Sequence, residues 1–316
     1  MSYAIIGYCG TSEFREELTA TSFDEICRAK ETSLLGLELE EKINLLLDNH
    51  YELEVELLSL AEANRIWPER QAVDAMRERM VLDRRIVNLL TACRLYLDHS
   101  CHTASFLFGK DSAGLKLVNE RTHKAYDGVF GYRLMEALRN YVQHRGLLVH
   151  LITYERNLVP HDARPFIQFT VAPKLDISIL GEDTKFKSSI LEEAKTVGGL
   201  IDLRWPVREY VSTILSLHIA LRNEITSSFG DRMTHYRSSV EKYKQSGDTP
   251  IIYPRAVELD DQGHCIREVA LVDHLLQHYD ALCQKNKASV DLVGSYSSSY
   301  CKPDKLRRGV SESQNR

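Results

Sequence analysis

The chain has 316 residues, of which 43% are hydrophobic and 27% charged, with a formal net charge of −5 and a pI of about 6.2. This length suits two domains better than one, and the composition is that of a globular protein with a sizeable core. The acidic balance argues against a protein that wraps duplex DNA, although a local basic patch could still bind RNA.

Several features of the sequence indicate the cellular compartment of the protein. No apolar run approaches the length of a membrane span, and the N-terminal residues lack the basic and apolar segments of a secretory signal. The seven cysteines are widely spaced and include no C-x-x-C pair, which favours reduced thiols over disulfides or a zinc site. We therefore expect a cytoplasmic protein without a membrane segment, metal or cofactor.

The first half of the chain has helical periodicity. Residues 1–28 are mixed, with a short strand predicted over Tyr3–Cys9. Apolar residues then recur at helical spacing in four stretches, predicted as Ala29–Arg65, Pro68–Phe108 with Pro68 in the first turn, Leu115–Tyr126 and Phe130–His144. Gly146 is a natural helix stop, so residues 29–150 predict an α-helical bundle.

The character of the sequence changes after Gly146. The predicted elements are strands over Leu147–Tyr154 and Phe166–Leu180, a helix over Lys185–Val197, a long helix over Asp202–Lys244 broken near Gly230, a hairpin of Ile251–Leu259 and Ile266–Val272 around Asp260–His264, and a helix over Asp273–Lys285. Residues 151–288 thus form an expected α+β region, and the Ser-rich basic tail 289–316 is predicted to be disordered. The predicted fold class is mainly α, a helical bundle followed by a smaller α+β region.

The segment 130–146 carries the strongest functional signal. On a helix, one face is apolar, and the other is polar, with Tyr132, Arg133, Glu136, Arg139, Asn140, Gln143 and His144. Asn140 and His144 are four residues apart and nearly superposed, whereas Arg139 and His144 lie about 140° apart around the helix. Arg139 and His144 therefore flank a polar strip rather than point the same way.

The residue types on this strip suit RNA cleavage without a metal. The 2′-hydroxyl must attack the adjacent phosphate, which requires proton transfer and positive charge on the transition state. Histidine can act as acid or base near neutral pH, and arginine binds phosphate oxygens with a planar fork. His144 lies in the last helical turn, where the helix dipole favours a positive charge, and Asn140 can orient the imidazole or hold a phosphate oxygen.

This segment resembles the HEPN superfamily, whose ribonucleases carry an Arg, usually a polar residue, and then a His on a helix of a small bundle. Arg139, Asn140 and His144 match that pattern, and the resemblance covers roughly residues 30–150. The run from Asn88 to His99 is also similar to an earlier core helix of such proteins. A second Arg-Asn-x-x-x-His run at 156–161 contains a proline in a strand-rich stretch, so the helical context favours the first.

The resemblance implies a metal-independent endoribonuclease that acts as a bacterial defence or toxin effector. Arg139, Asn140 and His144 would be catalytic, and Arg133, Gln143 and Arg145 would bind the RNA substrate. The motif helix would form a homodimer interface, and an antitoxin or defence complex could be a further partner. Two alternatives remain: a catalytically inactive module that binds RNA, nucleotide or protein, and a structural subunit of a defence assembly.

Overall fold

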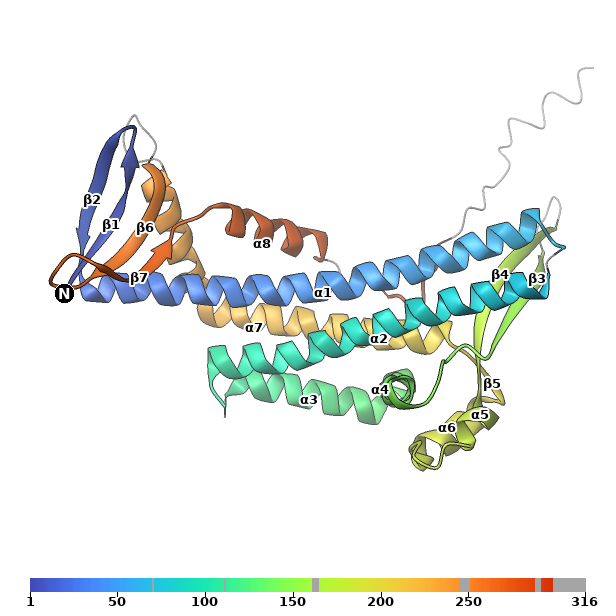
Figure 1. Cartoon of the computed structure of the whole chain (residues 1–316). Helices are drawn as coiled ribbons and strands as arrows, with labels where there is room; N and C mark the ends of the chain where they lie inside the picture. Colours follow the sequence, from blue (N-terminus) through green and yellow to red (C-terminus); the bar gives the residue numbers. More distant parts are fainter. Residues whose placement is uncertain (70, 111, 161–164, 245–250, 288–290, 298–316) are drawn as a thin grey trace, which may run out of the picture.

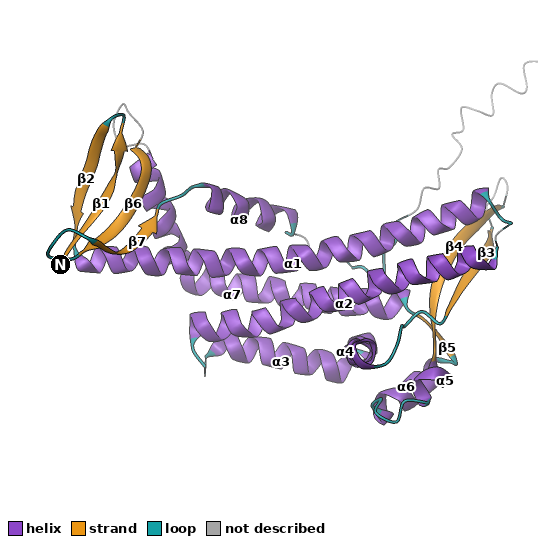
Figure 2. Ribbon diagram, in the orientation of Figure 1, coloured by secondary structure: helices purple, strands orange, loops and turns teal. Residues whose placement is uncertain are grey.

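A computed structural model describes residues 1–69, 71–110, 112–160, 165–244, 251–287 and 291–297. The elements in chain order are β1 (Ser2–Cys9), β2 (Ser12–Leu18), α1 (Ala20–Ile66), α2 (Ala72–Phe108), α3 (Ala113–Gly128), α4 (Phe130–His144), β3 (Leu151–Val159), β4 (Phe166–Asp176), α5 (Ile177–Gly181), α6 (Ser188–Val197), β5 (Leu200–Asp202), α7 (Arg204–Lys244), β6 (Ile251–Leu259), β7 (Cys265–Ala270) and α8 (His274–Lys285). The molecule is elongated, and α1 runs along most of its length (Figure 1). Helices lie between two small sheets at opposite ends (Figure 2), which confirms the predicted mainly α fold class.

The long helices form because apolar residues recur every three to four positions over many turns. In α1, Ile43, Leu46, Leu53, Leu57 and Leu60 are all buried. They join one core with buried residues of α2, α3, α4 and α7. The helix α7 packs along α1 and against α4, so it completes the bundle predicted from the first half of the chain.

The two sheets join distant parts of the sequence. At one end the strand order is β2-β1-β6-β7, and all neighbours are antiparallel. This sheet packs on the start of α1 and the end of α7 through a second apolar cluster that includes Ile5, Phe23, Tyr236 and Ala256. At the other end, β4 pairs with both β3 and β5. In the four-stranded sheet, strands from the beginning of the chain therefore pair with strands near its end.

Most predicted elements are confirmed, including the strand at Tyr3–Cys9, the hairpin around Asp260–His264 and the continuation of helix through Lys244. Several details were wrong. The helix α1 begins at Ala20 rather than Ala29, so residues 20–28 of the predicted N-terminal segment are helical, and the strand β2 in that segment was not predicted. The helix α2 begins at Ala72, so Pro68 precedes it; the N-cap is Gln71, whose N–H donates to Asp74 at 3.2 Å. The helix α7 continues unbroken through Gly230. The strand β3 starts at residue 151 rather than 147, and residues 177–181 form the helical turn α5 instead of strand.

The predicted boundary at residue 150 stays a prediction about domains, and many contacts cross it. The main core contains side chains from residues 39 to 225, and β1 of the N-terminal segment pairs with β6. Of the predicted tail 289–316, residues 289–290 and 298–316 lie outside the described residues.

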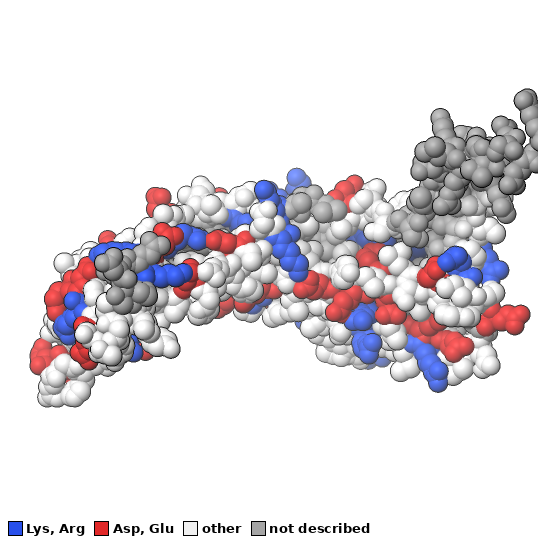
Figure 3. Space-filling view, turned by 90° about the horizontal axis from the view of Figure 1, so that it is seen from above, with Lys and Arg blue, Asp and Glu red and all other residues white. Residues whose placement is uncertain are grey.

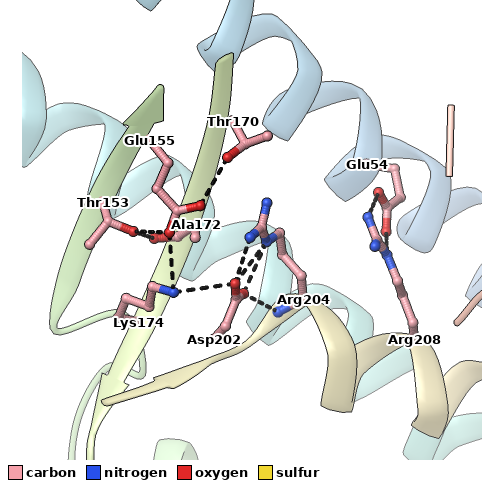
Figure 4. A network of polar contacts seen from close by, with 9 residues as sticks. All are labelled: Glu54, Thr153, Glu155, Thr170, Ala172, Lys174, Asp202, Arg204 and Arg208. Carbon is pink, nitrogen blue, oxygen red and sulfur yellow. Dashed lines mark hydrogen bonds and ion pairs between the residues drawn. The ribbon is translucent and has the colours of Figure 1, made fainter. Parts of the chain in front are cut away.

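A polar network holds the three-stranded sheet to α7 (Figure 4). The Asp202 carboxylate on β5 accepts from Arg204 of α7 at 2.6 Å and pairs with Lys174 of β4 at 3.3 Å. Lys174 also faces Glu155 of β3 at 3.6 Å. Beside this group, Glu54 of α1 makes a bidentate pair with Arg208 of α7, both distances being 2.7 Å. Every charge in this network has an opposite partner, which indicates a structural role.

Acidic and basic side chains are interspersed over the face of the molecule seen from above (Figure 3). The described residues of that face therefore form no continuous basic track for a nucleic acid. None of the helices within the described ranges combines the length and apolar character needed to cross a membrane.

Candidate functional site

The motif helix α4 is fixed against the bundle by its apolar face and by its N-terminus. Leu134, Met135 and Leu138 are fully buried in the main core. At the N-terminus, the N–H of Gly131 donates to the Glu209 carboxylate of α7 at 3.0 Å. A carboxylate at this position also interacts favourably with the helix dipole. The buried apolar face and this contact together hold the motif helix against α7.

Gly131 allows α4 to approach α7 closely. A Cβ atom at this position would lie 2.9 Å from the Pro206 Cα and 2.5 Å from the Glu209 Oε2. We expect Gly131→Ala to lower the free energy of unfolding by about 1–3 kcal/mol, because the backbone of α7 must shift. The control is Gly128→Ala, where nothing lies within 4 Å of the added atom. Urea unfolding of both variants measures the difference, and equal stabilities would contradict the proposed close contact.

Two residues predicted on the polar face of α4 contact α7. Tyr132 is buried, and its ring meets the Tyr210 ring edge-on with centroids 5.1 Å apart. Glu136 accepts a hydrogen bond from the Tyr210 hydroxyl and lies 3.7 Å from Arg94. Burial raises the pKa of both tyrosines. Tyr132 was predicted on the polar face of α4, and the structure instead buries it against α7.

The three predicted catalytic residues lie at the exposed end of α4. The helix ends at His144, as predicted, and the N–H of its C-cap Arg145 donates to the Tyr141 carbonyl at 2.8 Å. Asn140 and His144 are exposed. Arg139 donates from Nη1 to the Asn140 Oδ1 at 3.0 Å, and its Nε is buried without a partner in the described part of the chain.

Asn140 and His144 open onto a groove with a volume of about 730 Å³. This size lies within the usual range of small-ligand sites. One wall is α4, and the other comes from the connection between α5 and α6 and from the end of α3. The groove is lined by Tyr126, Glu136, Ala137, Asn140, Tyr141, His144, Arg145, Asp183, Lys185, Phe186, Lys187 and Ile190. Arg139 is not among these lining residues.

The electrostatic balance of the groove favours an anion. Its two carboxylates are occupied: Asp183 pairs with Arg145 at 3.3 Å, and Glu136 is held by Tyr210 and Arg94. Lys185 and Lys187, in contrast, are exposed cations on the groove wall. Within the described residues, the His144 imidazole makes no hydrogen bond or ion pair. The Lys187 ammonium donates one hydrogen bond, to the Tyr126 hydroxyl at 2.5 Å, and keeps its other donors. Lys185, Lys187 and His144 can therefore still contact a ligand.

The structure separates the three predicted substrate-binding residues. Arg145 lines the groove, whereas Gln143 is exposed outside its lining. Arg133 is used structurally: its guanidinium pairs with Glu193 of α6 at 2.5 Å and donates to the carbonyl oxygens of Tyr126 and Asp127. Of this group, only Arg145 shares the groove with Asn140 and His144.

The second wall of the groove was not predicted from the sequence. Lys185, Phe186 and Lys187 lie some 40 residues after the motif, in a stretch predicted only as the start of a helix. The tertiary contact between Phe186 and Tyr141, with ring centroids 6.2 Å apart, brings this segment to α4. The only local signal is an aromatic residue between two lysines, which occurs too commonly to identify a site.

Comparison with family models, with curated proteins and with solved structures gave no match for this chain. The resemblance of the motif segment to HEPN ribonucleases therefore stays a prediction. Across the part of the chain that the structure describes, no group of three or more His, Cys, Asp or Glu residues could hold a metal ion.

Proposed function

We propose that the chain is a metal-independent endoribonuclease of HEPN type that cleaves RNA in the groove of α4. The observation that carries this proposal is the position of His144 and Asn140 on a cationic groove whose carboxylates are already paired. An RNA phosphate can enter such a groove without meeting an unpaired negative charge.

The reaction is a transesterification. The 2′-oxygen of the ribose forms a bond to phosphorus as its proton leaves, and the bond from phosphorus to the 5′-oxygen breaks. His144, as the imidazolium, donates a proton to that leaving oxygen. The products are a 2′,3′-cyclic phosphate and a 5′-hydroxyl. Because each chain carries one such histidine in the motif, a second copy of α4 in a homodimer supplies the group that accepts the 2′-hydroxyl proton.

Arg139 and Asn140 act on the phosphate in this proposal. The Asn140 Oδ1 already accepts from Arg139, so the amide nitrogen of Asn140 is the group left to donate to a phosphate oxygen. The same hydrogen bond holds the Arg139 guanidinium beside Asn140, and its remaining donors stabilise the charge of the transition state. A bacterial defence or toxin effector, restrained by an antitoxin or a partner complex, is the cellular role that fits this chemistry.

The test is incubation of labelled RNA with the purified protein in EDTA. We expect the wild type to leave cyclic phosphate ends and His144→Ala to cleave at least about 100-fold more slowly, since general acid–base catalysis contributes that much. The matched control is His235→Ala, an exposed histidine of α7 roughly 40 Å along the helix from Glu209. Equal cleavage by the wild type and His144→Ala would overturn the assignment of His144.

A second candidate function is an RNA-binding module without turnover. It is favoured by the position of Arg139, which lies outside the groove lining and whose Nη1 already donates to Asn140. In that case the wild type binds RNA but produces no cyclic phosphate. Arg139→Ala then weakens RNA binding, and there is no cleavage for it to affect.

A further inference from the structure

The second wall of the groove is a shaped loop, defined here as residues 183–187 and called the lysine loop. The Asp183 Oδ1 accepts the N–H of Lys185 at 3.0 Å, and the N–H of Phe186 donates to the Asp183 carbonyl at 2.9 Å. This turn directs Phe186 inward, where it is 9% exposed, and leaves Lys185 and Lys187 exposed on either side.

Several contacts join the lysine loop to α4, which carries the motif, and to α3. Asp183 pairs with Arg145, the C-cap of α4, at 3.3 Å. Phe186 packs against Tyr141, the rings meeting at 76°. The Lys187 ammonium donates to the Tyr126 hydroxyl of α3 at 2.5 Å and lies 4.8 Å from the centre of that ring. The loop is therefore held at a fixed position beside His144, although it belongs to a part of the chain outside the motif segment.

The chemistry of the loop side of the groove combines cations with aromatic surface. Lys185 and Lys187 can neutralise phosphates, and the half-buried Tyr141 offers a ring to a flat base. Cations that follow a backbone, together with aromatic rings for unstacked bases, are the features that bind single-stranded nucleic acid. A duplex keeps its bases stacked on each other, so it cannot use the ring of Tyr141.

We propose that the lysine loop is a substrate-binding wall that holds single-stranded RNA across the groove, with Lys185 and Lys187 on backbone phosphates. This inference rests on the proposed function, because it assigns the segment that presents RNA to His144. It adds to that function a binding surface contributed by residues outside the region that resembles HEPN proteins.

The experiment measures binding separately from cleavage. A short fluorescein-labelled 2′-O-methyl RNA is titrated with protein in EDTA and followed by anisotropy; it has no free 2′-hydroxyl and cannot be cleaved by this route. We expect Lys185→Glu and Lys187→Glu each to weaken binding roughly 10-fold or more and to lower the dependence of affinity on salt, since about 0.7 of a counterion is released per single-strand phosphate contact. The duplex of the same sequence should bind more weakly than the single strand.

The matched control is Lys116→Glu, which makes the same charge change on an exposed residue of α3, about 15 Å along the helix from Tyr126. Three results would overturn the inference. RNA affinity could be unchanged in Lys185→Glu and Lys187→Glu, it could fall equally in the Lys116→Glu control, or the duplex could bind as tightly as the single strand. The inference is supported, even where no cleavage occurs, if the wild type and His144→Ala bind the RNA tightly and Lys185→Glu does not. Failure of the nuclease proposal is thereby distinguished from failure of this one.

Discussion

Replacing Glu40 by alanine is expected to lower the free energy of unfolding by about 3–5 kcal/mol, because it leaves a buried charge without its partner. Glu40 of α1 is 1% exposed, and its carboxylate accepts from Arg222 Nε and Nη2 of α7 at 2.6 and 2.5 Å. His218 Nε2 lies 2.8 Å from Arg222 and 3.3 Å from Glu40, and its Nδ1 meets the Tyr96 hydroxyl at 3.1 Å. This network joins α1, α2 and α7 inside the bundle.

The charges in this network depend on each other. Burial acts to raise the pKa of Glu40, but the hydrogen bonds from His218 and Arg222 outweigh it and hold that pKa below its ordinary value. Burial lowers the pKa of His218. Glu40 is therefore held as a carboxylate, and the Arg222 guanidinium depends on it as the counter-ion in this site.

Urea unfolding at neutral pH tests the prediction. The control is Glu38→Ala on the same helix, whose exposed pair with Lys42 is worth only about 0–1 kcal/mol. The double variant Glu40→Leu with Arg222→Leu should recover much of the lost stability, because apolar residues can replace a buried ion pair. A Glu40→Ala variant as stable as Glu38→Ala would show that the network does not hold the helices together.

Replacing Asp83 by alanine is expected to lower the free energy of unfolding by about 2–4 kcal/mol, because two buried amides lose their acceptor. Asp83 of α2 is 1% exposed, and its Oδ1 accepts the N–H groups of Leu148 and Val149, both at 2.8 Å. These two residues follow His144 by four and five positions, so Asp83 fixes the chain that leaves the motif helix. Asp83→Asn retains a carbonyl acceptor and should lose much less, as measured by urea unfolding of both variants.

Asp83 also predicts a pH dependence. Burial raises the pKa of this carboxyl above its ordinary 3.8, although the amides of Val149 and Leu148 act in the opposite direction. The folded state therefore binds the Asp83 proton more tightly than the unfolded chain does. Protonated Asp83 thus adds to the free energy of unfolding, fully below pH 3.8, and this contribution is lost as the pH rises through the folded pKa. The stability of the wild type relative to Asp83→Asn should fall as pH rises over that window, and a constant difference would contradict it.

The sequence determined the helical framework and the exposed end of the motif. Periodic apolar residues such as Ile43, Leu46, Leu134 and Leu138 specify amphipathic helices locally, because their spacing follows the helical repeat whatever packs against them. The same periodicity puts Asn140 and His144 on one side of α4, and the helix ends at His144 as expected. Strands flanking a short polar turn likewise identify the hairpin around Asp260–His264.

Only the tertiary structure decided which polar residues remain available. Tyr132 and Arg133 are both polar positions on α4, yet α7 buries the first and Glu193 pairs with the second. The lysine loop reaches the groove because Phe186 packs on Tyr141, and β1 joins β6 across most of the chain length. Local periodicity fixes the direction of a side chain on its own helix, whereas the partner that covers it is selected by contacts between residues far apart in the sequence.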